Sequence, residues 1–346
     1  MVCLHKDRRK SFGIIIPSFW LVHFAVYTVI GFLAFVPVFG IRLIFINFLY
    51  SVGVMILFFS VYRNEDPNAI TDVIGAAMIC ALIIITIKLI VEVQTLISYF
   101  AAGGGGHPGV TSFTGGGVNL EASLLALYSV FVMKKKYALP VYFMTLLISA
   151  LYSSRTAFIL SALVLIWYLV FVKPRTGRRN LTFLLLITVP FVAAVVYFMM
   201  TSSIGQVLIT RFLKTGDDAG SIGRIRIWEY TADVIVRYPF GVGCGNAVEA
   251  LGLLSGNTFG EGNMHNIFFQ ITLEQGIFVG LPFLIVSALW LLRREMKIRF
   301  QDPFGVFMLL YLVQGALQSK GVDAWMADIL GLYFISRKRN WYATAR

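Results

Sequence analysis

One arginine interrupts a stretch of the chain that is otherwise free of charge. Arg155 is the only charged residue within residues 137–171, and it lies between Ser154 and Thr156. A guanidinium group at membrane depth costs on the order of several kcal/mol unless it reaches water, the interface or a partner. Its planar fork can make two parallel hydrogen bonds to a phosphate and keeps its charge. A bound anion therefore explains Arg155 better than an arginine that only reaches the membrane surface.

A histidine precedes another apolar run. His265 and Asn266 come directly before residues that read as a membrane span, so the imidazole is expected at the mouth of that span. A neutral imidazole there could accept a proton from a hydroxyl group, although a lone histidine at a span end is commonly an interfacial residue. Helical periodicity turns Glu274 to the opposite face, where we expect a buried structural partner and not a second catalytic group.

The longest polar stretch, residues 201–264, has a helical pattern at its centre. Ser221 is expected to cap a helix over residues 223–237, which ends before a proline and a glycine. Arg224 and Arg226 lie about 100° to either side of its predicted apolar face. Such a helix can lie on the membrane surface with both guanidinium groups at its edge; the alternative is an interfacial helix whose arginines merely reach water. The predicted apolar face consists of Ile225, Trp228, Ala232, Ile235 and Val236.

The elements that position these residues follow from the composition. Hydrophobic residues make up 58% of the chain and charged residues 13%. A bilayer core requires about 20 apolar residues of each spanning helix. We therefore predict an all-α fold, a polytopic transmembrane bundle of about ten spans with a large, partly helical extracytoplasmic loop. The predicted spans are residues 14–36, 42–61, 70–91, 120–133, 137–153, 156–172, 181–200, 266–292, 303–319 and 325–336.

These spans divide the chain into three parts. Residues 1–200 form N-terminal transmembrane helices that include the Arg155 hairpin, residues 201–264 form the outer loop, and residues 265–346 form C-terminal transmembrane helices. Most of the 29 Lys and Arg residues fall on the cytoplasmic side if both termini are inside. The net charge of +12 is thereby explained by clusters beside anionic headgroups, and it does not indicate a nucleic-acid partner.

The remaining polar residues indicate structure more than chemistry. Lys88 and Glu92, one helical turn apart in the third span, are expected to neutralise each other. The four histidines and three cysteines show no ligand spacing, so we expect no metal and no cofactor. The glycine-rich residues 103–117, which include His107, lack the strand and helix of a phosphate-binding loop, and they predict a flexible loop over a substrate cleft.

Four motifs, taken in order and spacing, resemble one family, the bacterial O-antigen ligase and polymerase superfamily known as WaaL and Wzy. The resemblance covers about residues 111–292. Members are inner-membrane glycosyltransferases of the GT-C type that use undecaprenyl-diphosphate-linked glycans and no metal. They more often have about twelve spans, so this chain looks short. The motifs are Ser154-Arg155-Thr156, then Gly223-Arg224-Ile225-Arg226-Ile227-Trp228, then Pro239-Phe240-Gly241-Val242-Gly243, and finally His265-Asn266 with Gly276 beyond the next nine residues.

The resemblance implies roles for individual residues. Arg155 matches the family's hairpin arginine, Arg224 its loop arginine and His265 its loop histidine, and these three are the expected catalytic residues. Arg211 matches a further basic position less securely. The diphosphate of a lipid-linked donor would be bound by Arg155, Arg211, Arg224, Arg226 and Asn266.

Three functions stay open at this point. We favour polymerisation of lipid-linked repeat units at the periplasmic or outer face of the cytoplasmic (inner) membrane, with membrane lipid as surroundings and a chain-length regulator protein as a candidate partner. A ligase would use the same donor with a lipid A core or another acceptor. A lipid-glycan flippase belongs to a different class, and it is disfavoured because we find no internal repeat.

Overall fold

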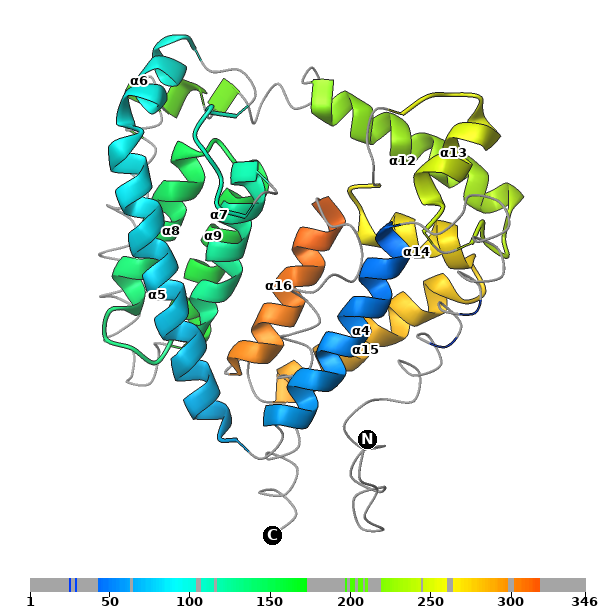
Figure 1. The fold of residues 1–346 in the computed structure, drawn as a ribbon, viewed down its shortest axis with the longest axis horizontal. Coiled ribbons are helices and arrows are strands. Elements are labelled where there is room, and N and C mark those ends of the chain that lie inside the picture. The colour runs from blue at the N-terminus through cyan, green and yellow to red at the C-terminus, as the bar shows by residue number, and fades with distance from the viewer. Residues whose placement is uncertain are drawn as a thin grey trace. The chain divides into compact units, whose positions relative to one another are not determined.

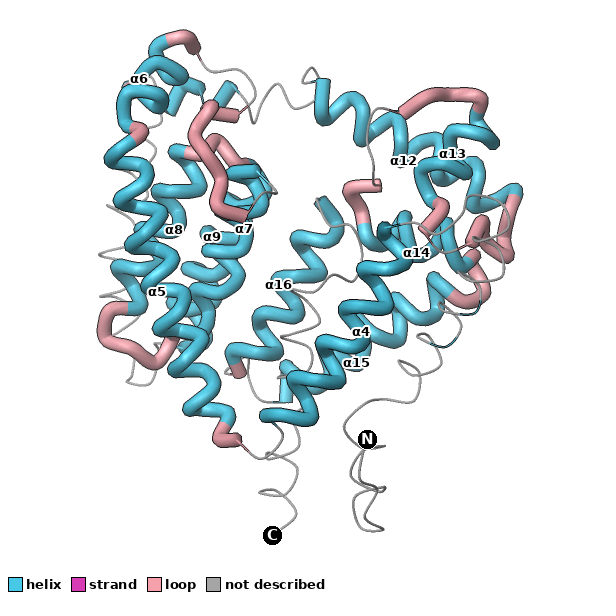
Figure 2. The backbone as a smooth tube through the Cα atoms, in the orientation of Figure 1, coloured by secondary structure: helices cyan, strands magenta, loops and turns pink. Residues whose placement is uncertain are grey.

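A computed structural model describes most of the central part of the chain. The described residues are 43–62, 65–103, 107–114, 117–172, 219–243, 245–259, 264–297 and 302–317, with isolated positions and short stretches elsewhere. Every regular element among them is a helix, with no strand in these ranges (Figures 1 and 2). The prediction of an all-α fold is confirmed for this part of the chain.

Several predicted spans coincide with helices. Two helices, Pro67–Val91 and Arg155–Val172, are long and apolar enough to cross a membrane, and shorter apolar helices accompany them. The ten-span bundle itself stays a prediction, because the spans at 14–36, 181–200 and 325–336 fall almost entirely outside the described residues. The matching helices are α4 (Leu43–Tyr62), α5 (Pro67–Val91), α7 (Gly117–Tyr128) with a 3₁₀ turn (Ser129–Val132), α8 (Ala138–Leu151), α9 (Arg155–Trp167) with a π-helical turn (Tyr168–Val172), and α16 (Pro303–Leu317).

The predicted span over residues 266–292 is wrong. The chain forms two helices there, α14 (Ile267–Gln275) and α15 (Gly280–Lys297). Gly276, with φ +77°, ends α14 in a conformation that non-glycine residues rarely adopt. Two further helices, α6 (Val93–Ala101) and α13 (Ala247–Ser255), lie in segments that we predicted to be loops.

The described residues divide into two compact units. Unit 2 comprises residues 68–221 and 297–310, and within it α8 and α9 form an antiparallel hairpin that packs on α7. The loop between α7 and α8 contacts the beginning of α5, where Lys135 forms an ion pair with Asp72 at 2.9 Å. The Arg155 turn follows the other end of α8, so this turn and the lysine-rich loop lie at opposite ends of that helix, as the predicted alternation of spans requires.

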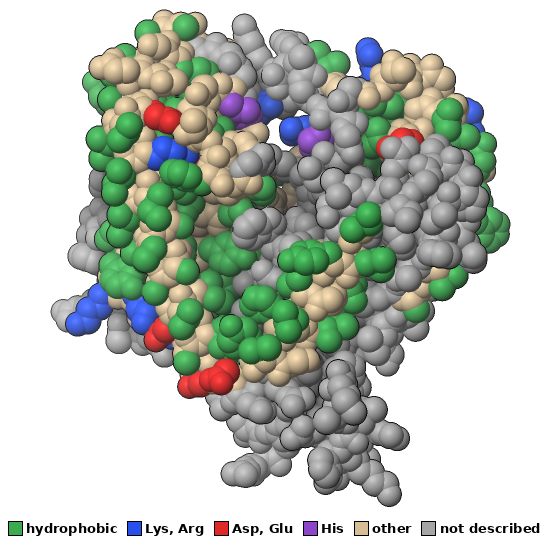
Figure 3. Space-filling view, in the orientation of Figure 1, with side chains coloured by type: hydrophobic (Ala, Val, Ile, Leu, Met, Phe, Trp, Pro, Cys, Tyr) green, Lys and Arg blue, Asp and Glu red, His purple; other side chains and the backbone are tan. Residues whose placement is uncertain are grey.

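Helix α5 presents an apolar outer face. Hydrophobic side chains run along it in Figure 3, and Val73, Ile84 and Ile90 are more than half exposed, at 69%, 52% and 67%. An aqueous surface would place polar residues at such positions, whereas lipid makes the exposure of isoleucine favourable. This face of α5 is therefore suited to contact with lipid.

Unit 1 comprises residues 1–67, 222–296 and 311–346. Here α12 (Ala219–Arg237) packs against α13 and α14 through Ile227, Val234, Leu251 and Leu273. The buried side of α12 therefore differs from the predicted one.

Two predictions for α12 are wrong. Ile225 and Val236 are 42% and 75% exposed, whereas Thr231 is buried. Thr231 tolerates burial because its hydroxyl donates to the carbonyl of Ile227 at 2.6 Å. Ser221 lies inside the helix and is not its N-terminal cap.

Candidate functional site

The residue after His265 fixes the beginning of α14. The side-chain oxygen of Asn266 accepts hydrogen bonds from the backbone N–H groups of Phe268 and Phe269, at 2.9 and 3.1 Å. Its amide nitrogen donates to the carbonyl of Ala316 at 3.0 Å. Asn266 is thus an N-cap that also joins α14 to α16. Because these bonds occupy the amide, a contact between Asn266 and a diphosphate stays a prediction.

His265 occupies a strained position in front of this cap. Its φ of +51° is uncommon for a residue with a side chain. The side chain is half-buried. Glu274, at the other end of α14, is completely buried, and its carboxylate accepts a hydrogen bond from Gln270 at 3.2 Å. Glu274 is therefore buried with a partner on its own helix, as expected for a structural residue.

Trp228 links α12 to the residue next to His265. Its indole N–H donates to the carbonyl of Met264 at 2.9 Å, and its ring lies 6.1 Å from that of Phe269. Arg224 lies one helical turn before Trp228, so both side chains leave α12 on the same side. This hydrogen bond places Trp228 beside the residue that precedes His265, and Arg224 lies one turn before Trp228 on α12. The sequence predicted Trp228 only as part of an apolar face and missed this hydrogen bond.

The two arginines of α12 differ in their surroundings. Arg224 is half-buried, with its Nε shielded from solvent, whereas Arg226 is exposed. Two residues of a helix separate them by about 200°, so Arg226 lies on the opposite side from Trp228. A common site of Arg224 and His265 stays a prediction, and of the two arginines Arg224 is the one on the Trp228 side of the helix.

The glycine motif after α12 holds the other end of α14. Val242 and Gly243 donate backbone hydrogen bonds to the carbonyls of Leu273 and Glu274, both at 3.0 Å, and Ile277 donates to the carbonyl of Pro239 at 2.8 Å. A Cβ atom on Gly276 would lie 2.2 Å from that proline carbonyl. Only glycine permits such a close approach of two backbones. The motif thus fixes the helix that His265 precedes.

Arg155 lies in unit 2, as the first residue of α9. Ser154 is the N-cap of this helix, and its hydroxyl accepts a hydrogen bond from the backbone N–H of Ala157 at 3.4 Å. Ser153, at φ +51°, makes the sharp turn between α8 and α9 and is buried. Arg155 itself is half-buried. The predicted hairpin is confirmed, and it presents a guanidinium group at the positive end of a helix dipole.

The predicted Lys88–Glu92 pair is wrong. Lys88 forms a buried ion pair with Glu121 on α7, and Glu92 instead accepts hydrogen bonds from the backbone N–H and the hydroxyl of Thr111, at 3.0 and 2.5 Å. The Glu92 N–H still donates to the Lys88 carbonyl at 2.9 Å, but both side chains reach Thr111 instead of each other, Lys88 at its carbonyl and Glu92 at its hydroxyl. A carboxylate within an apolar run was the signal in the sequence that could have identified Glu121.

The described part of the glycine-rich segment is anchored, which corrects the prediction of a flexible loop for residues 107–114. Besides the bonds of Thr111, the His107 ring contacts the carbonyl of Tyr152 through Nδ1 at 3.3 Å and the Asn119 amide through Nε2 at 2.6 Å. Of the remaining predicted site residues, Arg211 lies outside the described part of the chain.

A comparison with known families agrees with these motifs. Residues 140–284 match the family model Wzy_C, described as O-antigen ligase. A search of curated proteins gives no match. The matched segment begins in α8, contains Arg155, Arg224 and His265, and ends in α15. Residues 140–284 of this chain therefore form a domain of the O-antigen ligase and polymerase superfamily, whose members are membrane proteins.

Proposed function

We propose that this protein polymerises undecaprenyl-diphosphate-linked oligosaccharide repeat units at the outer face of the cytoplasmic membrane, as an O-antigen, capsule or exopolysaccharide polymerase. One observation carries the proposal. A single family segment contains Arg155, Arg224 and His265, and within it Trp228, one helical turn after Arg224, donates a hydrogen bond to Met264, the residue before His265, which supports a shared site. Both termini would lie in the cytoplasm.

The proposed reaction is a displacement at the anomeric carbon of the donor sugar. A hydroxyl group of the acceptor attacks that carbon from the face opposite the diphosphate, the bond between carbon and phosphate oxygen breaks, and the configuration inverts. His265 accepts the hydroxyl proton. Arg155 and Arg224 bind the diphosphate and stabilise the negative charge that it gains as it leaves. The activated donor supplies the driving force, and the two guanidinium groups supply the positive charge that a metal would otherwise provide, so the proposed step uses no metal.

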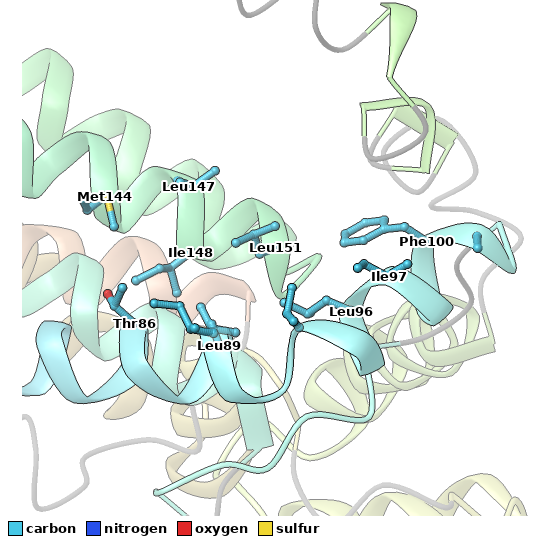
Figure 4. A pocket seen from close by; sticks show the side chains of 12 residues that line it. Thr86, Leu89, Leu96, Ile97, Phe100, Met144, Leu147, Ile148 and Leu151 are labelled. Carbon is cyan, nitrogen blue, oxygen red and sulfur yellow. The ribbon is translucent and has the colours of Figure 1, made fainter.

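The hydrocarbon tail of the donor needs an apolar site. Unit 2 has a cavity of about 460 Å³ between α5, α6 and α8, whose lining side chains are shown in Figure 4. Its one polar side chain, Thr86, already donates to the carbonyl of Leu82 at 2.7 Å, so the lining offers only hydrocarbon. Leu151 lines the cavity four residues before Arg155, which limits their Cα separation to about 14 Å. We propose that the polyprenyl chain enters here.

Purified protein with a defined lipid-linked donor tests the function. The wild type should extend the glycan, and the length distribution of the lipid-linked product reports each step. Replacement of Arg155, Arg224 or His265 by alanine should abolish extension while the protein level is unchanged. Arg237→Ala is the matched control, because this exposed arginine ends the same helix as Arg224. Normal product lengths in all three site variants would exclude the assignment.

The second candidate is an O-antigen ligase, which the description of the matched family favours. Polymerase and ligase share the donor and differ in the acceptor, which is another lipid-linked repeat unit for the first and a lipid A core for the second. The glycan of a deletion strain separates them. A single repeat unit on the core indicates a polymerase, whereas full chains that stay on the polyprenyl carrier indicate a ligase.

A further inference from the structure

A buried polar cluster in unit 2 lies next to the Arg155 turn, and the proposed reaction does not use it. The cluster consists of Lys88 on α5, Glu121 on α7 and Tyr152 at the end of α8, which are 7%, 2% and 0% exposed. Charged groups in apolar surroundings are costly, and a buried ion pair is a weak source of stability. The presence of this buried ion pair next to Arg155 therefore indicates a role other than stability.

Glu121 joins four parts of the unit. Its Oε1 accepts hydrogen bonds from the Lys88 ammonium group and from the Tyr152 hydroxyl, the latter at 2.5 Å. Its Oε2 accepts the backbone N–H of Phe113 at 2.8 Å. The ammonium group also donates to the carbonyl of Thr111 at 2.8 Å. One carboxylate thus fixes α5, α7, the end of α8 and the segment over residues 111–113 relative to one another.

Tyr152 passes this constraint to Arg155. Glu121 holds its hydroxyl, and the His107 ring contacts its carbonyl at 3.3 Å, so both ends of the residue are fixed. Three residues later Arg155 begins α9, and the turn between them allows little freedom, because Ser153 is buried in a left-handed conformation. A shift of Tyr152 would move the backbone from which the guanidinium group extends.

We propose that Glu121, Lys88 and Tyr152 are positioning residues that hold Arg155 in place for the donor diphosphate. The proposal rests on the function proposed above for Arg155. The cluster contacts no substrate in this scheme. It fixes the location of the Arg155 guanidinium group, whose interaction with phosphate depends on distance and direction. A misplaced guanidinium group loses its paired hydrogen bonds to phosphate.

The test measures the dissociation constant of undecaprenyl diphosphate for the full chain in nanodiscs by calorimetry. Tyr152→Phe removes only the hydroxyl group and should weaken binding by about three- to tenfold, the loss expected if the displaced Arg155 gives up one hydrogen bond to phosphate. Ser161→Ala is the matched control. It removes a buried hydroxyl that lies 3.1 Å from that of Ser149 in the same hairpin, away from the turn, and binding should stay within about twofold of the wild type.

The same substitution in an Arg155→Ala variant distinguishes a positioning role of Tyr152 from a general effect on stability. If Tyr152 acts through Arg155, then Tyr152→Phe should change binding no further once Arg155 is replaced by alanine. Equal weakening with and without Arg155 would overturn the proposal. So would unchanged binding accompanied by a lower melting temperature. A wild type that fails to bind undecaprenyl diphosphate would refute the proposed function instead.

A paired variant covers the case in which Tyr152→Phe does not fold. Lys88→Met with Glu121→Gln removes both buried charges together, which proteins tolerate better than the loss of one partner. Circular dichroism should show retained helix content, and binding should weaken by at least the factor expected for Tyr152→Phe. Wild-type affinity in this folded variant would overturn the proposal.

Discussion

A methyl group at Gly276 should disrupt the attachment of the glycine motif to α14. The Cβ atom of Gly276→Ala would meet three backbone atoms, the Pro239 carbonyl oxygen at 2.2 Å, the Phe240 carbonyl carbon at 2.5 Å and the Gly241 nitrogen at 2.7 Å. No side-chain rotation can relieve such contacts, so one of the two backbones must move. Because His265 precedes α14, we expect the change to reach the candidate site.

The expected loss of stability follows from the structure. A residue other than glycine at φ +77° and ψ 171° costs about 1 to 3 kcal/mol in strain. Three backbone hydrogen bonds join the motif to α14 and the turn after it, and each is worth about 0.5 to 1.5 kcal/mol. Their loss together with the strain amounts to roughly 3 to 7 kcal/mol. Gly256→Ala is the control, since its Cβ meets nothing within 4 Å and its left-handed conformation costs only about 1 to 2 kcal/mol.

Thermal melting followed by circular dichroism in detergent measures the difference. The two losses differ by about 1 to 6 kcal/mol, so at about 2 to 4 °C per kcal/mol Gly276→Ala should melt at least about 2 °C below Gly256→Ala. Glycan extension should be lost in the first variant and kept in the second. Equal melting temperatures, or wild-type extension by Gly276→Ala, would refute the inference that this backbone contact supports the site.

Three further predictions concern the arginines and the tryptophan. Arg224→Ala should weaken donor binding by about tenfold or more, as expected for the loss of a charge-assisted hydrogen bond. Replacement of the exposed Arg226 by alanine should change the binding less than about threefold. Calorimetry with undecaprenyl diphosphate measures both, and equal effects would contradict the difference in the surroundings of the two arginines. Trp228→Phe keeps an aromatic ring, although a smaller one, and removes the hydrogen bond to Met264. It should therefore lower stability by at least about 1 kcal/mol and slow glycan extension, which melting curves and product lengths report. Arg155→Lys should extend glycans more slowly than the wild type because an ammonium group loses the bidentate geometry, and equal initial rates would count against a paired contact with phosphate.

Much of the helical fold could be predicted because apolar runs end at charges or turns. The bounds of α5 and α16 agree with the predicted spans within a few residues, since Asp66 and Asp302 stand just before these helices. The break at Gly276 was missed because the apolar residues on either side of Glu274-Gln275-Gly276 were interpreted as one continuous span. A glycine there is tolerated in many helices, and only the approach of the Pro239 backbone makes the break necessary.

The partners of buried polar groups could not be predicted from spacing. Lys88 and Glu92 have the separation of a helical ion pair, but Glu92 bonds to Thr111, and the carboxylate that Lys88 contacts is Glu121, far along the chain. The buried face of α12 was misassigned for a related reason. A threonine can be buried when its hydroxyl donates to a carbonyl of the preceding helical turn. Thr231 does so, and the buried face of α12 therefore includes a polar residue that an apolar pattern leaves out.

The most direct measurement is a cryo-electron microscopy structure of the full chain in nanodiscs with undecaprenyl diphosphate bound. The account predicts one diphosphate with oxygens at about 2.7 to 2.9 Å from the guanidinium groups of both Arg155 and Arg224, with the sugar side of that diphosphate facing His265. A diphosphate that contacts neither arginine, or arginines that bind separate molecules, would contradict it.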